Sequence, residues 1–400
     1  MNCRRLPPDY VLLTVALVMV VLGIWLVLNA SYPRAAGAAH THGDPFFFAK
    51  RQGVGACIGF IAMLAAMKVP YWKWRRLSWA GVIVSVILLI LVFVPKVGVK
   101  ANGAWRWIDL PGIPFQIQSS EVAKLALVLF SADIGAKRRE KAVHPKHGLG
   151  IQILVLSLVA GLVVLEPDLG TALVLLTTWG ALAIVCGIPR RTAAVLAASV
   201  AAVVALECIR APYKMGRLLA FLDPWKYYHG AGYQIIHSLT ALGSGGFWGC
   251  GIGNGLQKYY FLPAVHTDFI VATLGEEKGL AGTLAMLLLF AVLSYRGFSI
   301  ASGTKDAFGS LLAFGITTCI TAQALLNFAV VSAFAPTTGV PLPLISYGGS
   351  SLVLTMFAVG VVLNVSMHPD RVVEEVASSS INRRNRGTYI SRAYGGRSSA

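Results

Sequence analysis

Long apolar stretches recur along almost the whole chain, and they restrict its possible folds more than any other feature. A bilayer core of roughly 30 Å needs about 20 apolar residues per helix, because backbone polar groups in lipid must be satisfied within the segment. With 56% hydrophobic and 13% charged residues, the sequence predicts an all-α polytopic membrane protein with ten transmembrane helices. The predicted helices lie near residues 10–30, 53–69, 77–95, 117–135, 149–165, 168–187, 191–209, 268–295, 307–334 and 349–367.

The positions of lysine and arginine orient this bundle, because cytoplasmic loops keep the excess of positive charge. Most of the 34 Lys and Arg residues fall in alternate loops on the side of the N-terminus. Both termini are therefore predicted to be cytoplasmic, in a multi-pass protein of the cytoplasmic membrane. The formal net charge of +17 then reflects topology and attraction to anionic lipids. No nucleic-acid-binding motif accompanies the charge, so we expect no nucleic-acid partner.

The two ends of the chain differ in character. The first apolar run follows Arg4 and Arg5 but is too long for a signal peptide, so we expect an uncleaved first span. Residues 369–400 are basic and rich in serine, which is typical of a disordered cytoplasmic tail. Residues 1–368 are thus expected to form one transmembrane domain. The six cysteines show no metal-ligand spacing.

Two outer segments carry more than a connecting role. In the first, Trp105 and Trp107 flank Arg106, as in an interfacial strand or turn with both indoles at headgroup depth. Arg106 is either a snorkelling cation or a phosphate ligand, because a guanidinium fork matches phosphate oxygens. The second segment, about 210–267, is a large extracytoplasmic loop between predicted helices 7 and 8, and loops of that length are functional or separately folded. It begins with a short amphipathic helix that presents Lys214 and Arg217 on one face.

Charged side chains in or beside the predicted helices are costly in hydrocarbon and need partners. Glu121 and Lys124 are three residues apart, so they can pair with each other on one helix. Glu276 and Glu277 form a second polar cluster on the eighth predicted helix. We hypothesise that one of these two glutamates pairs with Lys124 across helices.

Glu166 and Asp168 flank a proline in a very short outer turn. Two carboxylates at that spacing could bind a metal ion. A helix that begins after Asp168, with Asp168 as its cap, explains half of the motif without a metal.

Asp268 is the strongest candidate for chemistry. It stands where the long outer segment returns to the membrane, directly before an apolar helix. A carboxylate at that place can act as a general base, or it can simply cap the helix that follows. The residues alone leave both interpretations open.

A series of motifs runs in fixed order along the chain: Asn102–Ile108, Ser120–Leu125, Glu166–Thr171, Arg217 with Phe221–Pro224, Leu262-Pro263 with His266–Ile270, Gly275–Glu277 with Gly279, and Pro336–Pro343 with Ile345–Ser351. With these motifs the chain resembles the SEDS family, the bacterial proteins of shape, elongation, division and sporulation, over roughly residues 10 to 368. Ser119 replaces a usual proline, Lys214 replaces an arginine, and Ala264-Val265 replaces Glu-Ala, which leaves no second carboxylate in that loop. Within the family, the chain is more similar to the division branch (FtsW) and the sporulation branch (SpoVE) than to the elongation branch (RodA).

The resemblance implies a peptidoglycan glycosyltransferase that polymerises lipid II into β-1,4 glycan strands on the outer face of the cytoplasmic membrane, for cell division. It implies that Asp268 is the catalytic base, while Glu121, Glu166, Asp168, Glu276 and Glu277 form structural or polar clusters. A divalent cation, Mg²⁺ or Mn²⁺, could share the substrate pyrophosphate, although no metal site is evident, and no organic cofactor is expected. The expected substrate-binding residues are Arg106, Lys124, Lys214, Arg217, Gln257, His266, Thr267 and Ser346.

The resemblance also implies partners: lipid II, a class B penicillin-binding protein, and other proteins of the divisome or elongasome. Three alternatives remain open at this stage. The chain could be a polymerase of elongation or sporulation, a flippase that moves lipid II across the membrane, or a noncatalytic scaffold. A flippase needs a path that connects both membrane faces, whereas a polymerase needs an outward-facing site in which Asp268 is accessible.

Overall fold

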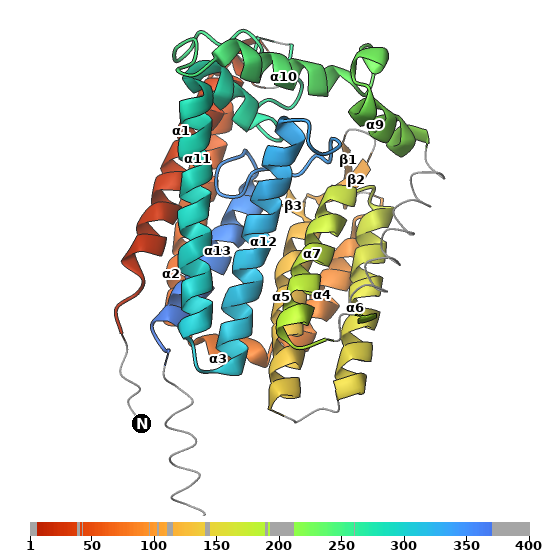
Figure 1. Ribbon diagram of the computed structural model, residues 1–400, viewed down its shortest axis with the longest axis vertical. Helices are drawn as coiled ribbons and strands as arrows, with labels where there is room; N and C mark the ends of the chain where they lie inside the picture. Colours follow the sequence, from red (N-terminus) through yellow and green to blue (C-terminus); the bar gives the residue numbers. More distant parts are fainter. Residues whose placement is uncertain are drawn as a thin grey trace, which may run out of the picture.

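The computed structural model is a bundle of long helices with loops and a small sheet gathered at one end (Figure 1). It describes residues 6–369 except for 38–40, 42, 96, 102–103, 110–114, 141–144, 189–190, 193–211 and 260. The tail predicted at 369–400 and the seventh predicted helix, 191–209, therefore lie almost entirely outside the described residues. The Lys214 side chain also lies outside them.

The described residues contain a helix at each of the other nine predicted positions. Six helices are long and apolar enough to cross a membrane, namely α1, α2, α6, α11, α12 and α13. Helix α5 is more polar, but α4, α6, α7 and α12 pack around it. The bounds are α1 (Tyr10–Gly37), α2 (Phe47–Lys68), α4 (Ser78–Leu91), α5 (Ser119–Arg139), α6 (Pro145–Leu165), α7 (Leu169–Val185), α11 (Ile270–Gly303), α12 (Ala307–Val331) and α13 (Gly349–Ser366).

Short elements complete the fold. Helix α3 (Tyr71–Arg75) lies at the end of the molecule where α1 begins and α13 ends (Figure 1). Helix α9 (Pro212–Leu222), the 3₁₀ turn η2 (Trp225–Tyr227) and α10 (Tyr233–Gly245) lie at the opposite end, where α10 crosses the top of the bundle. The predicted amphipathic helix at Lys214 and Arg217 is confirmed as α9. It ends before Pro224, because proline disfavours helix in the residue that precedes it.

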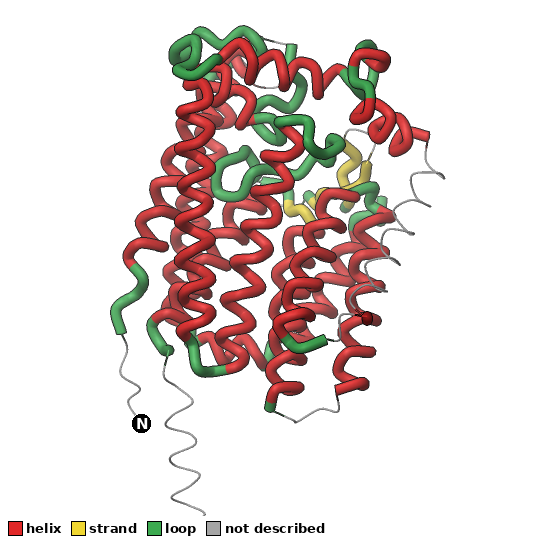
Figure 2. Tube along the Cα trace, viewed as in Figure 1, coloured by secondary structure: helices red, strands yellow, loops and turns green. Residues whose placement is uncertain are grey.

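A three-stranded antiparallel sheet corrects the all-α prediction. Its order is β1-β2-β3, with bounds β1 (Gly98–Ala101), β2 (Ala104–Ile108) and β3 (Ile117–Gln118). Trp107 of β2 pairs with Val99 on one side and with Gln118 on the other. The sheet sits beside the Ser119 end of α5 and the Leu169 end of α7 (Figure 2). Strand β2 therefore holds Arg106 at the edge of the helical bundle.

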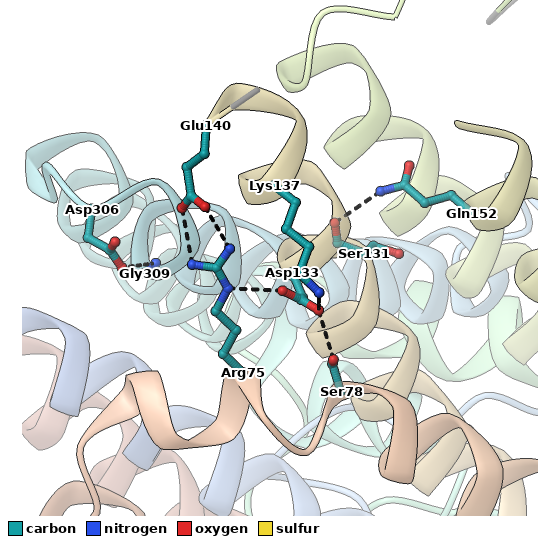
Figure 3. A network of polar contacts seen from close by, with 9 residues as sticks. All are labelled: Arg75, Ser78, Ser131, Asp133, Lys137, Glu140, Gln152, Asp306 and Gly309. Atoms are coloured by element: carbon teal, nitrogen blue, oxygen red, sulfur yellow. Dashed lines mark hydrogen bonds and ion pairs between the residues drawn. The ribbon is translucent and has the colours of Figure 1, made fainter. Parts of the chain in front are cut away.

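The opposite end of the bundle is fixed by an ionic network (Figure 3). The Arg75 guanidinium of α3 donates to Asp133 of α5 at 2.9 Å and to Glu140 at 2.8 Å. Asp133 is fully buried and also accepts from Lys137 and Ser78. Buried carboxylates need this kind of compensation, because an unpaired charge is costly away from water. The network ties α3, α4 and α5 together, far from the loops that carry Asp268.

Candidate active site

Asp268 lies in a loop, residues 262–269, that precedes α11 and that we name the Asp268 loop. Three successive backbone carbonyls of this loop accept hydrogen bonds from residues near the end of α12 or after it. The His266 carbonyl accepts from the Tyr347 amide at 2.9 Å, and the Thr267 carbonyl accepts from the Ser346 hydroxyl. The Asp268 carbonyl accepts from the Asn327 side chain at 2.8 Å. These bonds fix the backbone on which the carboxylate is mounted.

The structure separates the two interpretations of Asp268. Helix α11 begins at Ile270, its N-cap residue is Phe269, and no side chain caps it. The Asp268 carboxylate is therefore not used as a helix cap. Asp168 provides the contrast, because its carboxylate accepts from the Thr171 amide at 3.2 Å and from the Thr171 hydroxyl at 2.8 Å.

Two arginines and a glycine surround the Asp268 carboxylate. Arg106 donates to the backbone carbonyls of Glu166 and Pro167, so its guanidinium is anchored on the turn between α6 and α7. Arg217 of α9 donates to the Thr337 carbonyl at 3.0 Å. A Cβ atom at Gly339 would lie 3.6 Å from Asp268 Oδ2 and 3.8 Å from Arg106 Nη1. Gly339 has φ +73°, so glycine both allows the backbone conformation and leaves space between the two charged groups.

The loop that contains Gly339, residues 336–348, is held from α12, and we name it the 336–348 loop. Asn327 donates to the Val340 carbonyl at 2.8 Å, and Gln323, one turn away, donates to the Pro341 carbonyl at 2.9 Å. The Gln323 side-chain oxygen in turn accepts from Lys124. A ladder of buried polar groups on α12 and α5 thus positions the loop beside Asp268.

The environment of the Asp268 loop changes the titration of its side chains. Burial raises the pKa of Asp268 to about 6, although Arg106 and Arg217 pull it down. Burial and the nearby Arg34 charge lower the pKa of His266 to about 4. At neutral pH the carboxylate is therefore the proton acceptor of this loop, and the His266 imidazole is neutral. A base with a pKa near the working pH is well matched to general base catalysis.

The turn between α6 and α7 completes the site. Burial raises the pKa of Glu166 to about 8, against the hydrogen bonds at 2.9 and 3.0 Å from the Ser119 hydroxyl. Asp168 accepts from Thr171, Ser120 and Gln118, so its lone pairs are engaged. Glu166 and Asp168, which flank Pro167, therefore hold the turn that anchors Arg106. Their hydrogen bonds favour a structural role over metal binding.

The chain is similar to known proteins over nearly its whole length. A sequence profile described as that of a cell cycle protein family, comprising FtsW, RodA and SpoVE, matches residues 9–371. The chain belongs to the FtsW, RodA and SpoVE family. It is 40% identical over 360 residues to a probable peptidoglycan glycosyltransferase FtsW of Geobacter sp. (strain M18), covering 90% of this chain and 96% of that one. It is 39% identical over 378 residues to the stage V sporulation protein E of Bacillus subtilis, covering 92% of this chain and 99% of that one.

Solved structures in the family share the fold. A structure described as showing the coordination of polymerisation and crosslinking by a peptidoglycan synthase complex matches with a TM-score of 0.72 and 29% identity, over 90% of this chain and 98% of that one. The rod shape determining protein RodA of Thermus thermophilus matches with a TM-score of 0.66 and 27% identity, over 91% of this chain and 98% of that one. The family expected from the sequence motifs is thus confirmed.

The family motifs do not all meet at Asp268. The Ser346 hydroxyl donates to the Thr267 carbonyl and accepts from the Leu342 amide. The Thr267 hydroxyl donates to the Ala264 carbonyl. Both hydroxyls are therefore engaged within the protein. The Gln257 side chain lies 2.8 Å from the His237 ring on α10. These groups shape the loops of the site.

One predicted ion pair is wrong. Lys124 pairs with Glu121 at 2.8 Å, as the alternative interpretation of that motif predicted, and not with a glutamate of α11. Glu277 pairs with Lys258 at 2.6 Å, and Glu276 accepts from the Leu256 and Gln257 amides. Both glutamates of α11 therefore hold the segment between α10 and the Asp268 loop.

Two residues that position the site were not singled out from the sequence. Asn327 was hidden inside an apolar helix, although a polar side chain at such a place is itself a signal. Gly339 was part of a recognised motif, but its place between Asp268 and Arg106 depends on a backbone conformation that no residue pattern specifies.

Proposed function

We propose that this chain is a peptidoglycan glycosyltransferase that polymerises lipid II, with Asp268 as the catalytic base. One observation carries the assignment: the Asp268 carboxylate is not used as a helix cap, has a raised pKa, and lies beside two arginines. Buried carboxylates that serve only structure are usually saturated with hydrogen bonds, as Asp168 is here. Curated relatives named peptidoglycan glycosyltransferase support the reaction class.

The proposed reaction balances with one base. Asp268 accepts the proton of the acceptor's GlcNAc 4-hydroxyl as that oxygen forms a bond to C1 of the donor MurNAc. The bond from C1 to the pyrophosphate oxygen breaks, and its electron pair leaves with undecaprenyl pyrophosphate. The α-linked donor is inverted to a β-1,4 bond. A pyrophosphate is a good leaving group, so Arg106 and Arg217 need only stabilise its negative charge.

The described residues bring together no group of three His, Cys, Asp or Glu side chains that could hold a metal ion. Asp168 is engaged by hydroxyl and amide donors. A Mg²⁺ or Mn²⁺ ion taking part in the reaction would be held mainly by the substrate pyrophosphate, where it would neutralise charge. No step of the proposed reaction is assigned to it.

The setting of the enzyme is also part of the proposal. Residues 1–368 form a ten-span domain with both termini in the cytoplasm and Asp268 facing outward, and residues 369–400 form a basic cytoplasmic tail. The partner is a class B penicillin-binding protein, which the resemblance to a peptidoglycan synthase complex supports. The relatives named FtsW support a role in division, while the stage V sporulation protein E of Bacillus subtilis, at nearly the same identity, keeps sporulation as the second candidate role.

The decisive experiment is lipid II polymerisation by the purified full-length protein with its penicillin-binding partner, comparing wild type with Asp268→Asn. We expect the wild type to form glycan chains and the variant to lose activity by at least about a hundredfold, with the complex intact. Full activity of Asp268→Asn would remove the assigned base. An inactive wild-type complex that moves lipid II between leaflets would favour the flippase, and one that does neither would favour the scaffold.

A further inference from the structure

A second group of arginines lies at the outer ends of α1 and α2. Arg34 occupies the last turn of α1 and donates to the Leu262 carbonyl at 3.3 Å, at the start of the Asp268 loop. Arg51 lies in the second turn of α2, where its guanidinium packs over the Phe47 ring at 4.5 Å. It also lies near Tyr347, whose pKa is raised by burial and partly lowered again by Arg51. Both side chains thus approach the loops that build the site.

Within the described part of the chain, these two arginines form no ion pair with a carboxylate, in contrast to three of the lysines. Lys50, Lys124 and Lys258 each form an ion pair with a carboxylate. Among the described residues, no carboxylate lies within ion-pair distance of Arg34 or Arg51. An arginine carries five N–H donors, and the hydrogen bond from Arg34 to the Leu262 carbonyl uses one of them. The excess of cytoplasmic positive charge explains unpaired cations at the inner end of the bundle. The last turn of α1 and the first turns of α2, which carry Arg34 and Arg51, lie instead at the end that carries α10 (Figure 1).

A cluster of aromatic side chains lies between Arg34 and Arg51 and the Asp268 loop. The His266 ring packs against Phe48 at 4.6 Å and against Tyr347 at 5.6 Å. Gln52, next to Arg51, clamps the 336–348 loop by donating to the Ser346 carbonyl at 3.1 Å and accepting from the Gly348 amide at 3.3 Å. The Gln52 side chain therefore fixes this turn of α2, and with it the start of the Arg51 side chain, against the 336–348 loop.

The two pairs of arginines are distinct. Arg106 and Arg217 come from β2 and α9, and they lower the pKa of Asp268 itself. Arg34 instead acts on the neighbouring His266, whose pKa it lowers. In Figure 1 the outer end of α1 and the helix α9 lie at opposite sides of the upper end of the molecule. One pair thus adjoins the reacting carboxylate, and the other lies farther along the same loop.

Polymerisation of a lipid-linked sugar needs two anion sites, an argument that rests on the proposed function. The donor's pyrophosphate leaves from the reacting carbon, close to the base. The acceptor keeps its own pyrophosphate, which is attached two sugar rings away from the attacking hydroxyl. One pair of arginines cannot hold both groups. We propose that Arg34 and Arg51 form a second anion subsite, which binds the retained pyrophosphate of the acceptor lipid, while Arg106 and Arg217 serve the leaving group.

A single-coupling assay with two one-way substrates tests this assignment in the full-length protein with its penicillin-binding partner. A lipid II analogue whose GlcNAc 4-hydroxyl is blocked can only donate. An analogue whose anomeric oxygen is replaced by carbon cannot lose its pyrophosphate and can only accept. We expect Arg51→Gln and Arg34→Gln to raise the KM for the acceptor analogue by about tenfold or more, with the KM for the donor analogue within about twofold of wild type.

The controls make each outcome informative. Lys50→Gln removes a neighbouring exposed charge that is paired with Asp44, and we expect both KM values to stay unchanged. Arg51→Lys should recover part of the acceptor affinity, and thermal denaturation of each complex verifies folding. Equal effects on both substrates, no effect, or the same effect from Lys50→Gln would overturn the acceptor subsite while leaving the polymerase intact. A wild-type complex that cannot couple the two analogues would overturn the proposed function, and the subsite with it.

Discussion

Asp268 must be ionised to accept a proton, so its pKa of about 6 predicts the pH dependence of the enzyme. Burial raises this pKa, and the deprotonated base is therefore lost as the pH falls through about 6. We expect kcat/KM to fall about tenfold per pH unit below that value and to level off about one unit above it. Arg217→Gln removes a cation that lowers the Asp268 pKa, so the acid limb should move to higher pH. Initial rates of polymerisation across the pH range measure both effects, and a wild-type profile that stays flat through pH 6 would contradict the assignment.

Asn327 is expected to act as a positioning residue. Its side-chain amide bridges the Asp268 and Val340 carbonyls, so Asn327→Leu should let both loops shift while leaving the charges of the site in place. We expect kcat to fall about tenfold to a hundredfold with little change in KM, because small misplacements of a catalytic group are costly. Ser332→Ala is the matched control on α12, since that hydroxyl bonds only within its own helix turn. A loss confined to thermal stability, with kcat intact, would assign Asn327 to structure alone.

Glu166 offers a different test, because its pKa of about 8 makes it a neutral acid at pH 7. Glu166→Gln replaces a neutral group by another of the same shape, so we expect activity within about threefold of wild type. Glu166→Lys would place a cation at a fully buried position and should prevent folding. A loss of more than about a hundredfold in a folded Glu166→Gln complex would mean that the ionised carboxylate takes part in the reaction.

At the scale of elements, helix α7 must approach the 336–348 loop closely. A Cβ atom at Gly170 would lie 2.2 Å from Val340 Cγ2 and 2.8 Å from Thr338 Cβ, whereas one at Gly180 meets nothing within 4 Å. We therefore expect Gly170→Ala to displace the loop that carries Gly339 and to reduce polymerisation by about tenfold or more. Gly180→Ala lies on the same helix and should preserve activity, with equal or higher thermal stability because alanine favours helix. Activity assays on both purified complexes decide the matter, and equal activities would remove the proposed contact.

The elements also show what sequence reasoning could reach. Helices such as α1 and α12 were predicted because burial in lipid imposes a composition that a short window of sequence reveals. The strands of four, five and two residues were too short for a periodic signal. The role of Asn327 escaped because it bonds a carbonyl that lies 59 residues away along the chain. The Asp268 site was predicted as a motif, but only the fold separates the arginines near the carboxylate from Lys124 and Gln257, which serve neighbouring contacts.

At the scale of the whole molecule, the direction of the helices constrains the topology. Helix α7 ends where the Val185 carbonyl accepts from Arg139, at the end of α5 that also carries Glu140. Helix α9 begins at the opposite end, beside the strands (Figure 1). Helix α7 therefore ends, and helix α9 begins, at opposite ends of the bundle. Together with the nine helices among the described residues, this arrangement is compatible with the proposed ten spans.

Site-directed labelling in intact cells tests this arrangement. In a background whose six cysteines are replaced by serine, Trp248→Cys places a thiol at the end that carries α10, where Trp248 is 78% exposed. Arg76→Cys places one beside α3, where the side chain is also exposed. We expect a membrane-impermeant maleimide to label Trp248→Cys from outside and to label Arg76→Cys only after permeabilisation, because positive charge is retained in the cytoplasm. Labelling of both from outside would refute the ten-span arrangement. Labelling of Arg76→Cys alone would invert it, and Asp268 would then face the cytoplasm, away from the glycan that the proposed enzyme has to build.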